Sequence, residues 1–114
     1  MNPTQNASLL DRAAAHIERF GWTQGFLYDT SSPRPLNQCP VCAVGAMYMA
    51  SIGTPEPNSV DDELHALELA KPVEEHLGLN EGELPDWNDA PGRTKNEVAA
   101  ALRATAVKLR QHPA

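Results

Sequence analysis

No charged residue occurs between Arg34 and Glu56, and residues 41–52 within this stretch form the longest apolar run of the chain. Such a run is too short to cross a bilayer, which takes about 20 residues, so it predicts a helix buried in a soluble domain. Pro40 suits the first position of this helix, and Gly53 suits the residue that follows its end. We therefore expect a central apolar helix over about residues 40–52.

Two helices are predicted around it from hydrophobic periodicity before and after the acidic segment. The first covers about residues 9–20, with Ser8 as its N-cap and Gly21 after its end. The last begins with Thr94 and Glu97 in capping-box spacing. Its core stripe is predicted to contain Val98, Ala101, Leu102, Thr105 and Leu109, with Val107 on the opposite side.

A further helix is predicted after Ser59, which can act as its N-cap. Val60, Leu64 and Leu67 are spaced to form its buried stripe, and Pro72 is expected to end or kink it. The following residues 78–93 contain many acidic and turn-forming residues and are expected to form a long loop.

These elements predict an all-α fold, a compact bundle of four main helices with long loops. The chain has 114 residues, which suits one domain of the commonest size. We expect a single helical domain over residues 1–114, with residues 1–7 and 111–114 frayed.

The charge of the chain is unevenly distributed along the sequence. The net charge is −6, which argues against non-specific binding to nucleic acid. Residues 56–89 contain eleven acids and the single base Lys71, whereas residues 93–110 contain five bases and the single acid Glu97. This pattern fits a solvated surface with a dipole, or alternatively a charged face that meets a partner.

The start of the sequence carries no basic segment followed by an apolar one, and its first charged residue is Asp11. Without a secretory signal or a membrane-spanning run, the expected location is the cytoplasm. The two cysteines are then expected to be free or metal-bound, since a reducing compartment disfavours disulfides.

Cys39 and Cys42 form a C-x-x-C pair at the predicted start of the apolar helix. A thiolate at a helix N-terminus can be reactive, but the strand that precedes a thioredoxin-like motif is missing here. Zinc would need two more ligands, and His65 and His76 do not have zinc-finger spacing. The alternative to a reactive or zinc-binding pair is that both cysteines are small apolar side chains of the core.

The segment Trp87-Asn88-Asp89, followed by Arg93, is the candidate binding site of the chain. An indole, an amide, a carboxylate and a guanidinium close together could hold a small polar ligand or the terminus of a partner, and we add Trp22 to this set. The alternative is structural, with local turns formed by Asn88 and Asp89 and with Trp87 packed on the core.

Short motifs along the chain resemble those of a family of small proteins of unknown function from actinobacteria and their phages. These motifs are Gly21-Trp22, Cys42 with Gly45-Ala46, Trp87-Asn88-Asp89, and Arg93-Thr94 with Glu97-Val98. The resemblance implies that Cys42 belongs to the shared pattern and Cys39 does not. It also implies an ion pair between Asp89 and Arg93 across the turn, and it supplies no activity.

The sequence contains no catalytic or nucleotide-binding motif that we recognise, which leaves enzyme activity open and favours a protein without one. Our leading hypothesis is a small binding or regulatory accessory protein without a cofactor, acting on another protein or a small polar ligand. The alternative is a C-x-x-C protein that binds zinc or exchanges thiols. A third hypothesis, nucleic-acid binding through Lys95, Arg103, Lys108 and Arg110, conflicts with the acidic remainder. The oligomeric state stays open.

Overall fold

The computed structural model describes residues 2–111 of the chain. Their elements are α1 Pro3–Phe20, the 3-10 helix η1 Leu36–Gln38, α2 Ala43–Ile52, α3 Val60–Leu77, α4 Leu84–Asn88 and α5 Lys95–Gln111. No strand occurs in this part of the chain, so the predicted all-α class is confirmed. None of the helices in residues 2–111 is long and apolar enough to cross a membrane.

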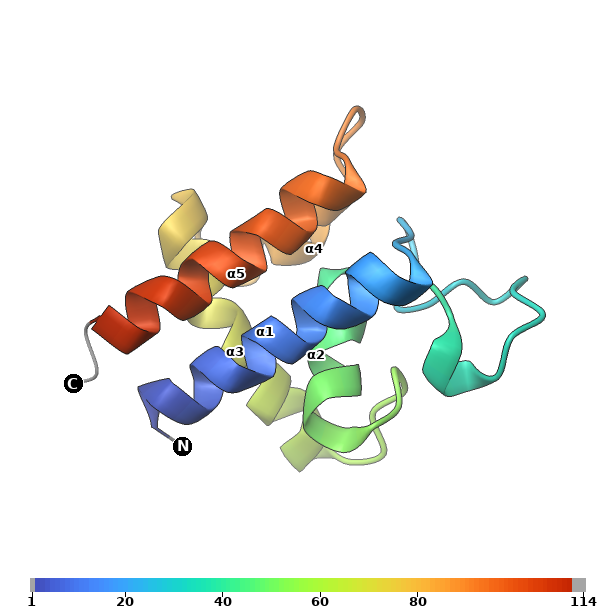
Figure 1. The fold of residues 1–114 in the computed structure, drawn as a ribbon, viewed down its shortest axis with the longest axis horizontal. Helices are drawn as coiled ribbons and strands as arrows, with labels where there is room; N and C mark the ends of the chain where they lie inside the picture. Colours follow the sequence, from blue (N-terminus) through green and yellow to red (C-terminus); the bar gives the residue numbers. More distant parts are fainter. Residues whose placement is uncertain (1, 112–114) are drawn as a thin grey trace.

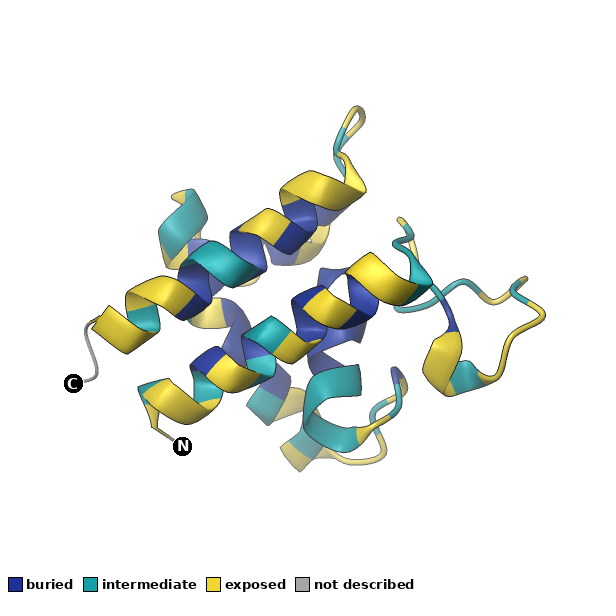
Figure 2. Cartoon of the chain, in the orientation of Figure 1, coloured by how far each residue is buried: buried dark blue, intermediate teal, exposed yellow. Residues whose placement is uncertain are grey.

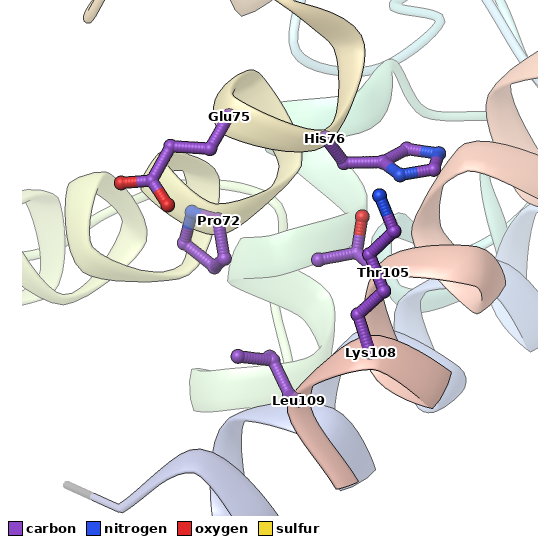
Figure 3. A pocket seen from close by; sticks show the side chains of 6 residues that line it. All are labelled: Pro72, Glu75, His76, Thr105, Lys108 and Leu109. Carbon is purple, nitrogen blue, oxygen red and sulfur yellow. The ribbon is translucent and has the colours of Figure 1, made fainter. Parts of the chain in front are cut away.

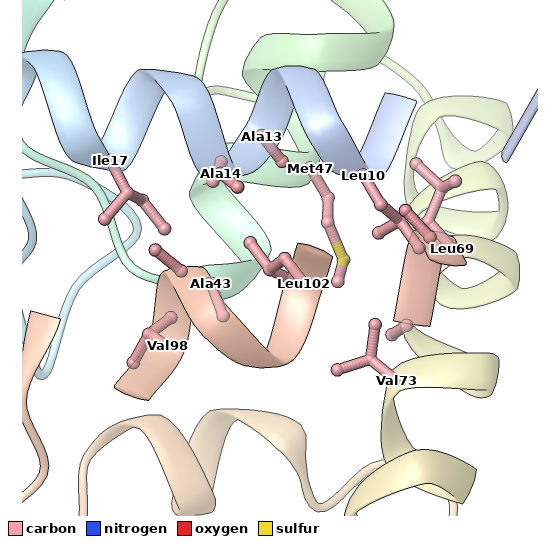
Figure 4. Packing of buried hydrophobic residues seen from close by; sticks show 14 of the residues in the cluster. Leu10, Ala13, Ala14, Ile17, Ala43, Met47, Leu69, Val73, Val98 and Leu102 are labelled. Atoms are coloured by element: carbon pink, nitrogen blue, oxygen red, sulfur yellow. The ribbon is translucent and has the colours of Figure 1, made fainter. Parts of the chain in front are cut away.

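Helices α1 and α5 lie side by side and run in opposite directions, although they are the first and last elements of the chain (Figure 1). Helix α2 packs against α1, α3 and α4, while α5 also contacts α3. The core side chains of α1, α2, α3 and α5 point toward one another, among them Leu10, Met47, Leu69 and Leu102 (Figure 4). Buried and exposed residues follow different faces of α1 and α5 (Figure 2).

Helix α1 begins earlier than predicted, because Asn2 and not Ser8 is its N-cap. The Asn2 side-chain oxygen accepts a hydrogen bond from the Gln5 amide at 2.8 Å, and Pro3 occupies the first helical position. Ala7 is fully buried against the core. Residues 3–7, which we expected to be frayed, therefore belong to the helix.

Helix α2 begins later than predicted, at Ala43, with Cys42 rather than Cys39 as its N-cap. Val41 is extended because it forms single β-bridges to Trp22 on one side and to Tyr28 on the other. These bridges hold the Val41 backbone away from helical geometry. The helix can start only after them, and the Cys42 Sγ accepts a hydrogen bond from the Gly45 amide at 3.3 Å.

Helix α3 continues through Pro72 to Leu77, so the prediction that the helix ends at this residue is wrong, whereas the alternative, a kink there, stays a prediction. Pro72 is only partly buried, and Glu68, four residues earlier, is exposed. Proline has no amide hydrogen, so the Glu68 carbonyl lacks the hydrogen bond that residue 72 would otherwise donate.

The buried stripe predicted for α3 is also wrong. Val60, Leu64 and Leu67 are 67%, 53% and 53% exposed. The core side of α3 is formed instead by Ala66, Leu69, Ala70 and Val73. Both sets of residues have helical spacing. The small side chains of Ala66 and Ala70 in the second set let neighbouring helices approach α3 closely.

The acidic segment that we expected to be a loop contains the short helix α4. The buried carboxylate of Glu74 on α3 accepts hydrogen bonds from the amides of Gly82 and Leu84, at 3.0 and 2.9 Å. It thereby fixes the start of α4 against α3.

The predicted capping box of α5 is confirmed. The Glu97 amide donates to the Thr94 hydroxyl at 3.2 Å, and the Thr94 amide donates to the Glu97 carboxylate at 3.0 Å. The predicted fraying of residues 112–114 lies outside the described residues, whereas Gln111 is the last residue of the helix.

Candidate functional site

The carboxamide of Asn88, at the end of α4, joins three separate segments of the chain. Its oxygen accepts hydrogen bonds from the Trp22 indole at 2.8 Å and from the Ala43 amide at 3.0 Å. Its nitrogen donates to the Thr23 carbonyl at 3.2 Å and to the Asp89 carboxylate at 2.9 Å. Asn88 is 1% exposed, and these four hydrogen bonds engage both polar atoms of its side chain within the fold.

Asp89 and Gln24 extend this network at the surface. The Asp89 carboxylate also accepts a hydrogen bond from the Gly25 amide at 2.9 Å. The Gln24 side chain donates to the carbonyls of Asn88 and Ala90, both at 3.0 Å. Together these bonds hold residues 22–25 against the end of α4.

Gly45 allows the chain segment around Leu27 to pass very close to helix α2. A Cβ at this position would lie 2.0 Å from the backbone oxygen of Leu27. That oxygen accepts the Cys42 amide at 3.1 Å, just before α2 begins. The segment around Leu27 can therefore cross α2 only where the helix has no side chain.

Trp87 and Arg93 form a second cluster. The Arg93 guanidinium carbon lies 4.0 Å from the centroid of the Trp87 ring, and its Nε donates to the Trp87 carbonyl at 2.9 Å. Arg93 forms an ion pair with Glu97 at 3.1 Å, whereas the Asp89 carboxylate accepts hydrogen bonds from the Gly25 amide and the Asn88 side chain. The ion pair between Asp89 and Arg93 that the resemblance implied is therefore absent from these contacts.

The candidate site predicted from sequence thus divides in two. Trp22, Asn88 and Asp89 share one hydrogen-bond network. Trp87 and Arg93 line a separate, shallow hollow of about 450 Å³, together with His76 and residues of α5. A second hollow of about 290 Å³ is also lined by His76, together with Thr105 and Lys108 (Figure 3).

The predicted zinc ligands do not come together as a set. In residues 2–111, no three side chains of His, Cys, Asp or Glu are grouped so that they could hold a metal ion. Cys39 and Cys42 are 3% and 8% exposed, while His65 and His76 belong to α3. Burial raises the pKa of the Cys42 thiol and outweighs the hydrogen bond from the Gly45 amide, which acts in the opposite direction.

A surface that sequence reasoning missed, apart from Asn88 and Asp89 at one end of it, lies on the side formed by α2, α3 and α4. Two hollows of about 230 Å³ each share Val44 and Pro85 as lining residues. We call this surface the docking groove, and its apolar residues are Phe26, Leu27, Val44, Tyr48, Leu67, Leu84 and Pro85. Most residues that line the hollow beside Leu67 are apolar, and Glu63 and Glu74 line it as well.

The exposed stripe of α3 continues from the docking groove. Leu67 belongs to both surfaces, and Leu64 and Val60 follow it at helical spacing toward the start of α3. Phe26, at the other end of the groove, is 66% exposed. Four of the five large exposed apolar side chains of the described residues therefore lie along one surface, and only Val107 lies elsewhere.

Carboxylates lie close to this surface. Burial raises the pKa of the Tyr48 phenol, and the nearby carboxylates of Glu63 and Asp62 raise it further.

The sequence signal that could have revealed this surface is the presence of two apolar stripes on α3. One helix needs only one apolar stripe to contact the core, so the second stripe is available for another contact.

Comparison with known proteins supplies a family and no activity. No curated protein and no solved structure matches the chain. The model of one protein family, described as a family of unknown function (DUF6197), matches residues 1–108. Since this match covers nearly the whole sequence, the chain belongs to that family.

Proposed function

We propose that this protein is a small binding accessory protein that holds a partner protein in the docking groove. The observation that carries the proposal is the exposure of Val60, Leu64 and Leu67 beside an apolar hollow. Contiguous exposed apolar surface of this kind is typical of interaction sites, whereas single exposed residues such as Val107 are common.

The energetic reason is the free energy of burying these side chains. Complete burial of one large aliphatic or aromatic side chain contributes about 1.5–3 kcal/mol. Val60, Leu64, Leu67 and Phe26 are each more than half exposed. A partner that covers them gains from several such side chains on one surface.

The proposal is tested by comparing two serine variants in affinity purification from the native host. Leu64→Ser/Leu67→Ser removes the stripe, and Val107→Ser is the matched control because Val107 is 51% exposed, close to the 53% of each leucine. We expect one protein to be retained by the wild type and by Val107→Ser, and lost from the double variant. Equal recovery with all three proteins contradicts the proposal.

A second candidate is a small polar ligand in the hollow beside Trp87 and Arg93, which supports it by its volume of about 450 Å³. Ala100 lines this hollow and is exposed, so Ala100→Tyr fills the hollow without removing a core contact. Mass spectrometry of small molecules released from the denatured wild type, and absent from the variant, would support this candidate. Identical spectra from the two proteins would exclude it.

A further inference from the structure

We infer that the partner of the docking groove is a basic amphipathic helix, laid along the first two turns of α3. This inference rests on the proposed function, because it names the chemistry of the partner that the groove receives. It follows from the acids beside the exposed stripe, from the length of the stripe, and from the volume of the adjoining hollow.

Acidic side chains flank the apolar stripe of α3 on both sides. Successive residues of an α-helix are rotated by about 100°, so Glu63 lies on one side of the line from Val60 to Leu67, and Asp61 and Glu68 lie on the other. All three acids are exposed. A partner with an apolar stripe between two rows of lysine or arginine matches this arrangement.

The acidic character extends beyond α3. Residues 56–89 contain eleven acids and one base. The buried Glu74 is occupied inside the fold by the amides of Gly82 and Leu84. Glu81 and Asp86 of the same segment are exposed and add to its negative potential, whereas Glu75 lines the separate hollow beside His76 and Thr105.

Lys71 limits the length of the site. It follows Leu67 at the next position of the same stripe, and it is exposed. The apolar part of the stripe therefore spans about 10 Å, from Val60 to Leu67, at about 1.5 Å per residue. The cations of the partner are expected to face this part, because Lys71 would repel them further along the helix.

The hollow beside Leu67 can receive an anchoring side chain of the partner. Its volume is about 230 Å³, and a cavity of about 150 Å³ already holds a benzene molecule. Tyr48 and Ala70 line it. Recognition would then combine one inserted apolar side chain with contacts along the α3 stripe, as in other grooves that bind helices.

Charge disfavours a second copy of this chain as the occupant. Pairing of two α3 stripes would bring acids against acids. Two of the four basic residues of α5 are already engaged, because Arg103 pairs with Glu18 at 2.6 Å and Arg110 pairs with Asp11 at 2.7 Å, which leaves Lys95 and Lys108 on that helix.

The test uses the full chain and three synthetic helical peptides that share one apolar face of leucines at helical spacing. Their flanking positions carry lysine, glutamine or glutamate. We expect the lysine peptide to bind about tenfold more tightly than the glutamine peptide in fluorescence anisotropy at low salt, and the glutamate peptide to bind weakest. The advantage of the lysine peptide should shrink as salt is added.

A charge-reversed variant separates recognition from misfolding. In Glu63→Lys/Glu68→Lys the order of the three peptides should invert, and a variant that simply failed to fold would bind none of them. Leu64→Ser/Leu67→Ser should weaken all three.

Three results overturn the inference and differ in what they say of the proposed function. Equal binding of the three peptides, abolished by the serine variant, rejects a basic partner and retains the groove. Absence of binding by any peptide at millimolar concentration rejects the groove as well. A dimer of the chain that Leu64→Ser/Leu67→Ser dissociates would identify a second copy as the occupant.

Discussion

A single buried carboxamide links the loop after α1, the start of α2 and the end of α4. Asn88 makes four hydrogen bonds, and its partner Trp22 lies 66 residues earlier in the sequence. The sequence predicts both residues as candidate binding residues, because an indole and an amide can contact a small polar ligand. It could not show that they use their polar groups on each other, since this depends on contacts between distant segments.

Asn88→Ala is expected to destabilise the protein by about 3 kcal/mol, because it leaves the Trp22 indole and the Ala43 amide without their acceptor. Urea unfolding followed by circular dichroism measures this change. Asn37→Ala, at an exposed position, is the control and should have little effect. A small effect at Asn88 would mean that water replaces the lost acceptor.

Neither cysteine thiol is expected to react in the folded protein. Cys39 and Cys42 are buried, and burial raises the pKa of Cys42, so a thiolate is disfavoured there. A chromogenic disulfide reagent should label both thiols only after denaturant is added, and elemental analysis should find no zinc. Rapid labelling of the native protein, or about one zinc ion per chain, would revive the C-x-x-C hypothesis.

At the scale of helices, the sequence predicts the capping box of α5 correctly, but it does not predict the N-cap of α1 or the features that depend on distant segments. The Thr94–Glu97 capping box lies within one turn, so the sequence contains everything that specifies it. The sequence predicts that α2 starts at Pro40, before its actual start at Ala43. The cause is long-range, because the bridges from Val41 to Trp22 and Tyr28 hold the Val41 backbone extended. The stripe of α3 was misassigned because periodicity shows that a face is apolar and does not show what covers it.

Gly45→Ala is expected to destabilise the protein by about 3 kcal/mol, because its Cβ would meet the Leu27 backbone oxygen at 2.0 Å. The sign of the effect is informative, since alanine stabilises an unobstructed helix interior by about 1 kcal/mol relative to glycine. Thermal unfolding measures it. A stabilised variant would show that the Leu27 segment can move away from α2.

Pro72→Ala is expected to stabilise the protein by about 2 kcal/mol. Alanine supplies the amide that the interior of α3 lacks, and the greater freedom of the unfolded chain offsets part of the gain. A higher urea midpoint with an unchanged slope is the expected result. A lower midpoint would show that contacts of the proline ring outweigh the missing hydrogen bond.

At the scale of the whole molecule, charge has two separate roles. Asp61, Glu63 and Glu68 flank the exposed stripe beside the docking groove, whereas Asp11 and Glu18 on α1 pair with Arg103 and Arg110 on α5. The sequence showed the uneven distribution of charge. It did not show which cations are already paired, because the pairs join opposite ends of the chain.

The ion pairs between α1 and α5 predict an acid-dependent loss of stability. Hydrogen bonds from Arg103 hold the pKa of Glu18 below its ordinary value of 4.5, so the unfolded chain binds this proton at higher pH than the folded one. The stabilisation is complete above the ordinary pKa and is lost as the pH falls through the lowered one. Glu18→Gln should be less stable than the wild type at pH 7, and the difference should narrow toward pH 3 in urea titrations. A constant difference would mean that the pair is not formed in solution.

The packing of α1 against α5 also determines how long the apolar side of α1 stays exposed during translation. The ribosome makes α1 before α5, so the apolar side of α1 lacks its main covering helix until residues 21–94 have also been synthesised. Contacts between such distant segments form slowly, because the loop between them must close first. Leu10 and Ile17 are therefore exposed on the nascent chain for much of that time, which makes α1 the segment that a chaperone would meet and the segment most prone to aggregate when translation stalls.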